Sequence, residues 1–279
     1  MLPYCQADAT SKSRQWAVRL PVFKSRSLMC LLVTGIALCT ISKIIVLDLL
    51  MKIIDEMFLA RYVDGKRCEI LSPGHLESQY HNASDCFSNS DIQQIILGLV
   101  FAVADVFEQN KIPYWLDSGT LLGSHRERTV IPYDNDADIG IDEATYIRLR
   151  DGDERLEFPS VYKFTLYEAK HREHGGRDDG IPGRLIHTKS GLYVDIFVFM
   201  ESKTKWTDAE PMFGPVPSWC FGSCVRCPKV RKIGREFKIP KSWVFPLKKC
   251  WFGSREVTCP AETEKYLDHL YGPTYMTPQ

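Results

Sequence analysis

Three aspartates at alternate positions, Asp134, Asp136 and Asp138, stand directly before an apolar run near the middle of the chain. In an extended strand, successive side chains point to opposite faces, so residues two apart share one face. The three carboxylates are therefore expected to project together. Because residues 139–141 continue as Ile-Gly-Ile, the acids lie at the start of a buried strand.

Like charges at this spacing repel one another unless a cation lies between them. Carboxylate oxygens are hard ligands, which suit Mg²⁺ or Mn²⁺ better than zinc. A polar turn or an exposed strand end is the alternative for such a pattern. Because a buried strand follows, we favour a metal site and predict Asp134, Asp136 and Asp138 as its ligands.

A small-residue turn, Ser118-Gly119-Thr120, follows a short apolar segment and leads into a second one, Leu121-Leu122-Gly123. A strand, a glycine-containing turn and a helix N-terminus together favour anion binding, because free backbone N–H groups and the helix dipole point at the ligand. We predict that Ser118, Gly119 and Thr120 bind phosphate. Arg126 lies between this turn and the acids, and a guanidinium suits phosphate, although a solvated surface arginine is the alternative.

A fourth acid, Asp195, interrupts the apolar run LYVDIFVF over residues 192–199. An ionised carboxylate inside a buried strand is costly unless it is paired or bound to a metal. We predict Asp195 as a further metal ligand, and a buried salt bridge is the alternative.

Apolar periodicity predicts the surrounding elements. A core-facing helix is expected from near Asp91 to Asn110, and a short strand over residues 114–116. Asp142 and Glu143 are expected to cap a helix that ends near Arg150. A strand over residues 162–167 and a hairpin of residues 184–187 and 192–199 follow.

Composition limits the class of protein. The chain has 279 residues, 44% of them hydrophobic, and a formal net charge of zero. This is enough for one sizeable domain with an appendage. The balanced charge gives no support to nucleic-acid binding, which would show as a basic excess.

The N-terminal appendage has the pattern of a membrane signal-anchor. Residues 1–27 are basic, and residues 28–50 are mostly apolar with Lys43 among them. A bilayer span needs about 20 apolar residues, and basic residues before it predict a cytoplasmic N-terminus. We therefore expect a cytoplasmic tail over residues 1–27, a transmembrane helix over 28–50 and a lumenal remainder. A cleaved signal peptide and a buried amphipathic helix are the alternatives.

Residues 51–90 read as a polar lumenal stem, and residues 91–279 as the catalytic domain. The sequon at Asn82 and the seven cysteines after the anchor fit an oxidising compartment. Cys68 and Cys86 could pair with each other. The late cysteines could supply a structural Zn²⁺ site or form two disulfides with one thiol left over; they are Cys220, Cys224, Cys227, Cys250 and Cys259.

The motifs W-L-x-x-G-T-L-L-G, I-P-x-D-x-D-x-D-I-G and V-D-I-F together resemble the LicD/fukutin family. The C-terminal tyrosine- and glycine-containing segment, residues 266–278, looks like the family's closing signature. The resemblance covers roughly residues 91–279. It implies an α/β (α+β) fold in which a nucleotidyltransferase-like mixed sheet is flanked by helices. It also implies a CDP-alcohol donor, a glycan or glycoprotein acceptor, and a single-pass type II protein of the Golgi or endoplasmic reticulum.

The predicted reaction is metal-assisted phosphoryl transfer. Asp136, Asp138 and Asp195 are the expected catalytic residues, and with Asp134 they would hold Mg²⁺ or Mn²⁺. A metal-dependent glycosyltransferase that uses a nucleotide-sugar is the first alternative, and a non-catalytic lumenal partner is the second. Oligomer formation is compatible with the sequence.

Overall fold

The computed structural model describes residues 41–50, 60–63, 65–69, 71, 75–82, 84–152, 156–167, 181–202, 211–230 and 234–278. The chain divides into two units, Met1–Met57 and Phe58–Gln279, and each is considered by itself. In the first unit, residues 41–50 form a helix with exposed side chains. The predicted tail and residues 28–40 of the predicted signal-anchor lie outside the described residues, so both stay predictions.

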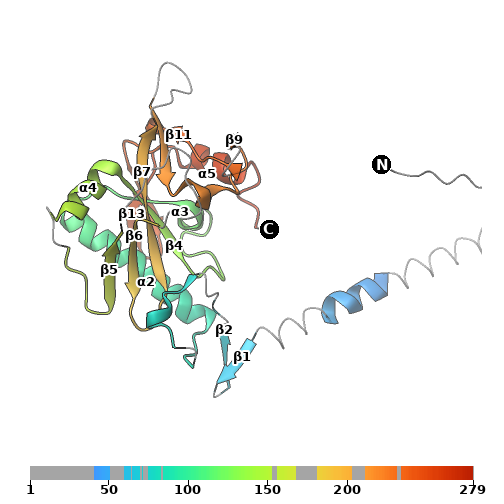
Figure 1. Ribbon diagram of the computed structural model, residues 1–279. Helices are drawn as coiled ribbons and strands as arrows, with labels where there is room; N and C mark the ends of the chain where they lie inside the picture. The colour runs from blue at the N-terminus through green and yellow to red at the C-terminus, as the bar shows by residue number, and fades with distance from the viewer. Residues whose placement is uncertain are drawn as a thin grey trace, which may run out of the picture. The chain divides into compact units, whose positions relative to one another are not determined.

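A mixed sheet forms the centre of the second unit (Figure 1). Its longest strand, β7, pairs in parallel with β4 along one edge. Along its other edge it pairs antiparallel with β6 and then with β8. The outer pairs are β3 with β4, β5 with β6, and β11 with β8. Within the described residues the strands of this sheet are β3 (Trp115–Leu116), β4 (Ala137–Asp142), β5 (Tyr162–Leu166), β6 (Gly183–His187), β7 (Tyr193–Ser202), β8 (Met212–Val216) and β11 (Ile239–Pro240).

Residues 193–200 of β7 are all buried, which explains why its sequence is almost continuously apolar rather than alternating. The mixed sheet, together with the helices of this unit, confirms the predicted mixed α/β fold. The hairpin and the two strands expected over residues 114–116 and 162–167 are confirmed as well. In the described part of the chain, three small antiparallel pairs stand apart from this sheet: β1 (Ala60–Val63) with β2 (Lys66–Glu69), β9 (Lys229–Val230) with β10 (Gly234–Arg235), and β12 (Lys248–Phe252) with β13 (Arg255–Cys259).

The predicted core helix is α2 (Asn89–Gln109), which packs against β6 and β7. It begins two residues before the predicted start. Ser88 is the cap, and Asp91 is the third helical residue of a capping box in which each side chain accepts the other residue's backbone N–H. Among the described helices, α2 is long and apolar enough to cross a membrane, but half of its most apolar stretch is buried in the domain.

The helix α3 (Ser118–Arg126) follows β3 directly, with Asp117 as its N-cap. The helix α4 (Glu143–Asp151) is capped by Asp142, as predicted, because its carboxylate accepts the Thr145 backbone N–H at 2.8 Å. The last helix is α5 (Thr263–Tyr271), and the 3₁₀ turns are η2 (Ser78–Tyr80), η3 (Ser218–Phe221) and η4 (Lys241–Trp243).

Three disulfides join six of the described cysteines. The predicted Cys68–Cys86 bridge is confirmed. Among the late cysteines, the bridges are Cys224–Cys227 and Cys250–Cys259. Sulfur atoms bonded to each other cannot serve as thiolate ligands, so the paired cysteines do not form a four-sulfur Zn²⁺ site in this structure, although Cys224, Cys227 and His269 lie close enough together to hold a metal ion. This structure shows the alternative of two disulfides among the late cysteines.

Candidate active site

The predicted acids meet where β4 and β7 begin. Asp138 is the direct partner of Asp195 in the parallel pair. Directly opposed residues of neighbouring strands lie on the same face of the sheet, and Asp136 shares that face because it is two residues before Asp138. Two acids far apart in the sequence are therefore brought side by side by strand register.

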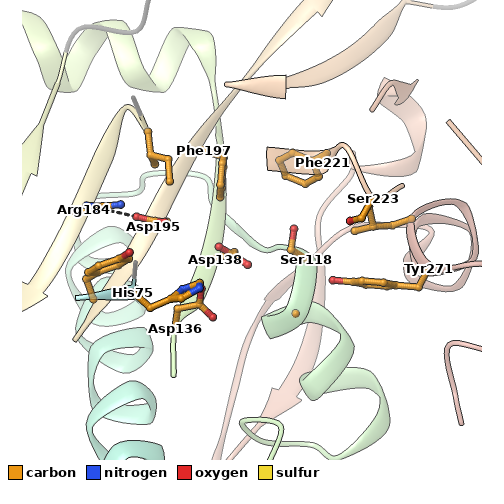
Figure 2. A pocket seen from close by; sticks show the side chains of 14 residues that line it. His75, Ser118, Asp136, Asp138, Arg184, Asp195, Phe197, Phe221, Ser223 and Tyr271 are labelled. Carbon is orange, nitrogen blue, oxygen red and sulfur yellow. Dashed lines mark hydrogen bonds and ion pairs between the residues drawn. The ribbon is translucent and has the colours of Figure 1, made fainter. Parts of the chain in front are cut away.

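These acids line a cavity of about 480 Å³. Figure 2 shows Asp136, Asp138 and Asp195 on one side, and Ser223 and Tyr271 across the cavity from them. Phe197, Phe221 and Leu270 supply an apolar part of the lining. The complete lining is His75, Ser118, Gly119, Asp136, Asp138, Ile181, Arg184, Tyr193, Asp195, Phe197, Phe221, Ser223, Leu270 and Tyr271.

Asp138 stands among the other carboxylates of this group. Burial, and after it the negative charges of Asp136 and Asp195, raise the pKa of Asp138 well above its usual range. Its backbone is fixed from α3, since the Asp138 N–H donates to the Thr120 hydroxyl at 2.8 Å. Thr120 therefore holds the backbone of β4 through this hydrogen bond, and it is not part of the cavity lining.

Asp136 has a histidine neighbour that the sequence did not reveal. The His75 imidazole lies 2.7 Å from Asp136, measured from Nδ1 to Oδ2. Burial pushes the pKa of Asp136 upward, but the hydrogen bond and the charge of His75 outweigh it, so the pKa is lowered. The same hydrogen bond raises the pKa of His75.

Asp134 lies beside the α3 N-terminus and outside the cavity lining. A Cβ placed on Gly119 would lie 3.3 Å from the Asp134 Oδ2 atom. Burial, and then the charge of Asp136, raise the pKa of Asp134 to about 7. Asp134 therefore borders the site through Gly119, at the rim of the acid group.

Asp195 forms the buried salt bridge that was the alternative interpretation. Arg184, its direct partner on β6, donates from Nε to Asp195 Oδ1 at 2.6 Å. Burial raises the pKa of Asp195 to about 6, and the Arg184 charge opposes this rise. The same guanidinium donates to Glu77 at 2.6 Å and lies 4.0 Å over the Tyr193 ring.

The predicted phosphate turn lies beside the acids and lines the same cavity. Ser118 and Gly119 are in the lining, and Ser118 adopts the left-handed region with φ of 45°. The Ser118 N–H donates to the Asp117 carboxylate at 2.7 Å, whereas Leu121 makes the first intrahelical bond, to the Asp117 carbonyl. The amide groups between them belong to the helix N-terminus, where an anion is favoured.

Arg126 is not brought to the cavity. It is the last residue of α3, about 12 Å along the helix axis from Ser118. Its guanidinium donates to Glu127 at 2.7 Å and to the Tyr275 carbonyl at 3.3 Å. The arginine of the lining is instead Arg184. Arg184 is the second residue of β6. The signal available in the sequence was its place in the predicted hairpin, opposite an apolar strand with one acid.

The acid group fits a divalent cation. Three carboxylates reach the cavity; His75 pairs with Asp136 and Arg184 pairs with Asp195. Within the described residues, Asp138 is influenced by four neighbouring aspartates that all raise its pKa. A buried carboxylate among like charges, with oxygen donors beside it, is the chemistry that Mg²⁺ and Mn²⁺ require.

Residues 111–262, more than half of the chain, match the family model described as LicD/FKTN/FKRP, nucleotidyltransferase domain. The human ribitol-5-phosphate transferase FKTN is 31% identical over 174 residues, which cover 60% of this chain and 30% of that protein. The uncharacterized protein RT0683 of Rickettsia typhi is 27% identical over 168 residues, 60% of this chain and 42% of that protein. The match to the FKTN relatives thus spans about 30% of their length.

Among solved structures, the chain is similar to the crystal structure of ANT(2")-Ia in complex with adenylyl-2"-tobramycin. The sequence identity is 15% and the TM-score is 0.26, over 53% of this chain and 69% of that one. The family resemblance of the sequence motifs is confirmed by the family match, which contains β3, α3, β4 and β7 and all four predicted metal-site aspartates. The chain belongs to the LicD/FKTN/FKRP family.

Proposed function

We propose that this protein transfers a phospho-alcohol from a CDP-activated donor to a glycan hydroxyl, in a reaction that depends on Mg²⁺ or Mn²⁺. The alcohol is of the ribitol-phosphate, glycerol-phosphate or phosphocholine type. The observation that carries this proposal is the register of Asp138 and Asp195 beside the α3 N-terminus, in one cavity of a family domain. The name of the FKTN relatives, ribitol-5-phosphate transferase, supports a phospho-alcohol.

Asp136, Asp138 and Asp195, with Asp134 at the rim, would hold the cation. A bound Mg²⁺ or Mn²⁺ would supply positive charge that stabilises the phosphoryl transition state and the departing CMP. The chain's own contribution is to position the diphosphate. Backbone N–H groups at the start of α3 and the Arg184 guanidinium face the same cavity from different elements.

In the transfer itself, the acceptor hydroxyl attacks the phosphorus that carries the alcohol. The bond from that phosphorus to the bridging oxygen breaks, and CMP leaves with the electron pair. The hydroxyl proton passes to a carboxylate, for which Asp195 and Asp134 are the candidates, since the pKa values of both are raised toward neutrality. The apolar side of the cavity, with Phe197, Phe221 and Leu270, would exclude water from this step.

The cellular setting follows as part of the same proposal. Residues 1–27 would be cytoplasmic, residues 28–50 would anchor the chain, and residues 51–90 would lead to a catalytic domain over residues 91–279 in the Golgi or endoplasmic reticulum lumen. The disulfides support an oxidising compartment.

The test is a donor screen on the full chain in detergent. Released nucleotide is measured with Mn²⁺ or Mg²⁺ and, in turn, CDP-ribitol, CDP-glycerol, CDP-choline and UDP-sugars. We expect metal-dependent CMP release from one CDP-alcohol, lost in Asp136→Ala. The matched control is Asp105→Asn, which removes an exposed acid that pairs with Arg255 away from the cavity. Release of UMP or UDP would assign the protein to the glycosyltransferases instead. No nucleotide release from any donor in the presence of glycan acceptors would favour a non-catalytic partner.

A further inference from the structure

A segment upstream of the family match, residues 75–82, is docked on the catalytic domain. The Glu77 N–H donates to the Gly191 carbonyl at 2.9 Å, and His81 Nδ1 lies 3.3 Å from the Ser190 carbonyl. Gly191 has a φ of 78°, and a Cβ added to it would lie 2.8 Å from the Glu77 carbonyl oxygen. The hairpin turn between β6 and β7 therefore fits this upstream segment closely.

Two side chains of the upstream segment reach the acid group. His75 lies 2.7 Å from Asp136, and Glu77 lies 2.6 Å from Arg184, which in turn contacts Asp195 at 2.6 Å. Figure 2 shows His75 beside Asp136 and Arg184 beside Asp195. In each case the contact uses one carboxylate oxygen, Oδ2 of Asp136 and Oδ1 of Asp195. The second oxygen of each carboxylate takes no part in these two contacts.

We propose that the upstream segment is part of the metal site, in which His75 positions Asp136 and Glu77 positions Asp195 through Arg184. The inference rests on the proposed function only for its metal ion, not for its donor. Carboxylates that bind a metal are commonly held by an outer hydrogen bond, and loss of such a partner typically costs 10- to 100-fold in metal affinity. Arg184 is held on three sides, by Glu77, Asp195 and the Tyr193 ring, so Glu77 limits the directions in which the guanidinium can turn.

Positioning and simple electrostatics predict opposite results for His75. If the His75 imidazole only competed with the metal ion for the Asp136 carboxylate, its removal would free that carboxylate and tighten metal binding. If it positions Asp136, its removal leaves the carboxylate free to rotate and weakens metal binding. The sign of the change in affinity decides between the two roles.

The experiment measures the affinity of the full chain for Mn²⁺ alone, by calorimetry and by Mn²⁺ paramagnetic resonance. We expect at least tenfold weaker binding in His75→Ala and in Glu77→Ala. His75→Gln, which keeps an N–H donor, should recover most of the loss. The control Glu201→Ala removes an ion pair with Lys241 outside the cavity and should change the affinity less than twofold.

Unchanged or tighter Mn²⁺ binding in His75→Ala would overturn the inference, as would equal losses in His75→Gln and His75→Ala. Failure of the wild type to bind Mn²⁺ would overturn it together with the metal dependence of the proposed reaction. If Mn²⁺ binds, His75→Ala weakens it and no donor is turned over, then the donor proposal fails and this inference stands. His75 is nearly half exposed, so its substitution leaves the core intact.

Discussion

Asp138 on β4 and Asp195 on β7 are direct partners in a parallel strand pair, and this register assembles the site. Side chains alternate between the two faces of a sheet, so a shift of one residue would turn Asp195 away from the cavity. The register is fixed by the neighbouring apolar residues, because Ile139 and Ile196 are also partners and both are buried. The packing of the core therefore sets the spacing of the acids.

The first prediction concerns Asp138→Asn. Removal of a buried charge that is repelled by its neighbours should stabilise the metal-free protein, as is common for functional residues. We expect the Tm in EDTA to rise by about 3–6 °C, which corresponds to about 1–2 kcal/mol in a domain of this size. Because the pKa of Asp138 is raised in the folded state, the difference should grow as pH rises above 3.8 and vanish below it.

The same variant should lose the metal response. Mn²⁺ should raise the Tm of the wild type, since a ligand that binds the folded state stabilises it, and should leave Asp138→Asn unchanged. The control is Asp142→Asn on the same strand, because asparagine is an equally good helix cap for α4. A Tm of Asp138→Asn that still rises with Mn²⁺ would remove Asp138 from the metal site.

Much of the site could be predicted from the sequence because its signals are local. The alternate spacing correctly predicts that Asp136 and Asp138 face one cavity, although Asp134 lies outside its lining. The Ser118-Gly119 turn closely follows the short strand β3. Asp195 is a lone acid in an apolar strand, and the few residues around it are enough to predict that its carboxylate is paired or bound to a metal. Each of these signals lies within one element, where side-chain direction follows from backbone geometry.

The partners of the acids could not be predicted in this way. His75 and Glu77 come from a segment that reads as a stem, and they reach Asp136 and Arg184 across the domain. Arg126 is close to the acids in sequence, but α3 carries it away from them. Arg184 is distant in sequence, and β6 carries it to Asp195. Such pairs depend on tertiary packing, which single-sequence patterns do not encode.

The second prediction concerns Gly140 on β4. The Trp115 indole packs against this glycine, and an added Cβ would lie 2.2 Å from Trp115 Cε2. Trp115 is fully buried and cannot move aside, so Gly140→Ala should destabilise the protein by about 2 kcal/mol or more in urea unfolding. The control is Gly98→Ala inside α2, which meets only the Tyr162 hydroxyl at 3.1 Å and gains up to about 1 kcal/mol of helix propensity. Equal urea-unfolding midpoints for Gly140→Ala and Gly98→Ala would contradict the close packing of Trp115 on Gly140.

The third prediction concerns the buried pair of Asp117 and Tyr266. The Tyr266 hydroxyl donates to Asp117 Oδ1 and so joins α5 to the N-terminus of α3. The other oxygen of Asp117 is buried and has no hydrogen-bond partner in the part of the chain that the structure describes. Tyr266→Phe should therefore cost about 2–3 kcal/mol, because it leaves the carboxylate still less satisfied. Tyr162→Phe, at a half-buried tyrosine on β5, should change the unfolding free energy little. A similar loss in both variants would argue against a special role for the Asp117–Tyr266 pair.

The fourth prediction concerns the Cys224–Cys227 disulfide, which stands behind one wall of the cavity. Its loop is tied to α5, since Val225 N–H donates to the Leu270 carbonyl at 2.8 Å. Ser223 and Leu270 both line the cavity, so loss of the bridge should loosen that wall. We expect Cys224→Ser with Cys227→Ser to raise KM for the donor while leaving Mn²⁺ affinity unchanged, and to cost about 2 kcal/mol of stability by loop entropy.

The matched control for this prediction is the bridge between β12 and β13. Cys250→Ser with Cys259→Ser opens a longer loop, with a sequence separation of 9 rather than 3, and should cost about 3 kcal/mol. Neither cysteine lines the cavity, so KM should stay unchanged although stability falls further. A higher KM in the Cys224 and Cys227 variant, combined with a larger loss of stability in the Cys250 and Cys259 variant, would show that the Cys224–Cys227 bridge shapes the cavity wall. Stoichiometric zinc in protein purified without reductant, lost in the Cys224 and Cys227 variant, would instead show that these sulfurs are metal ligands.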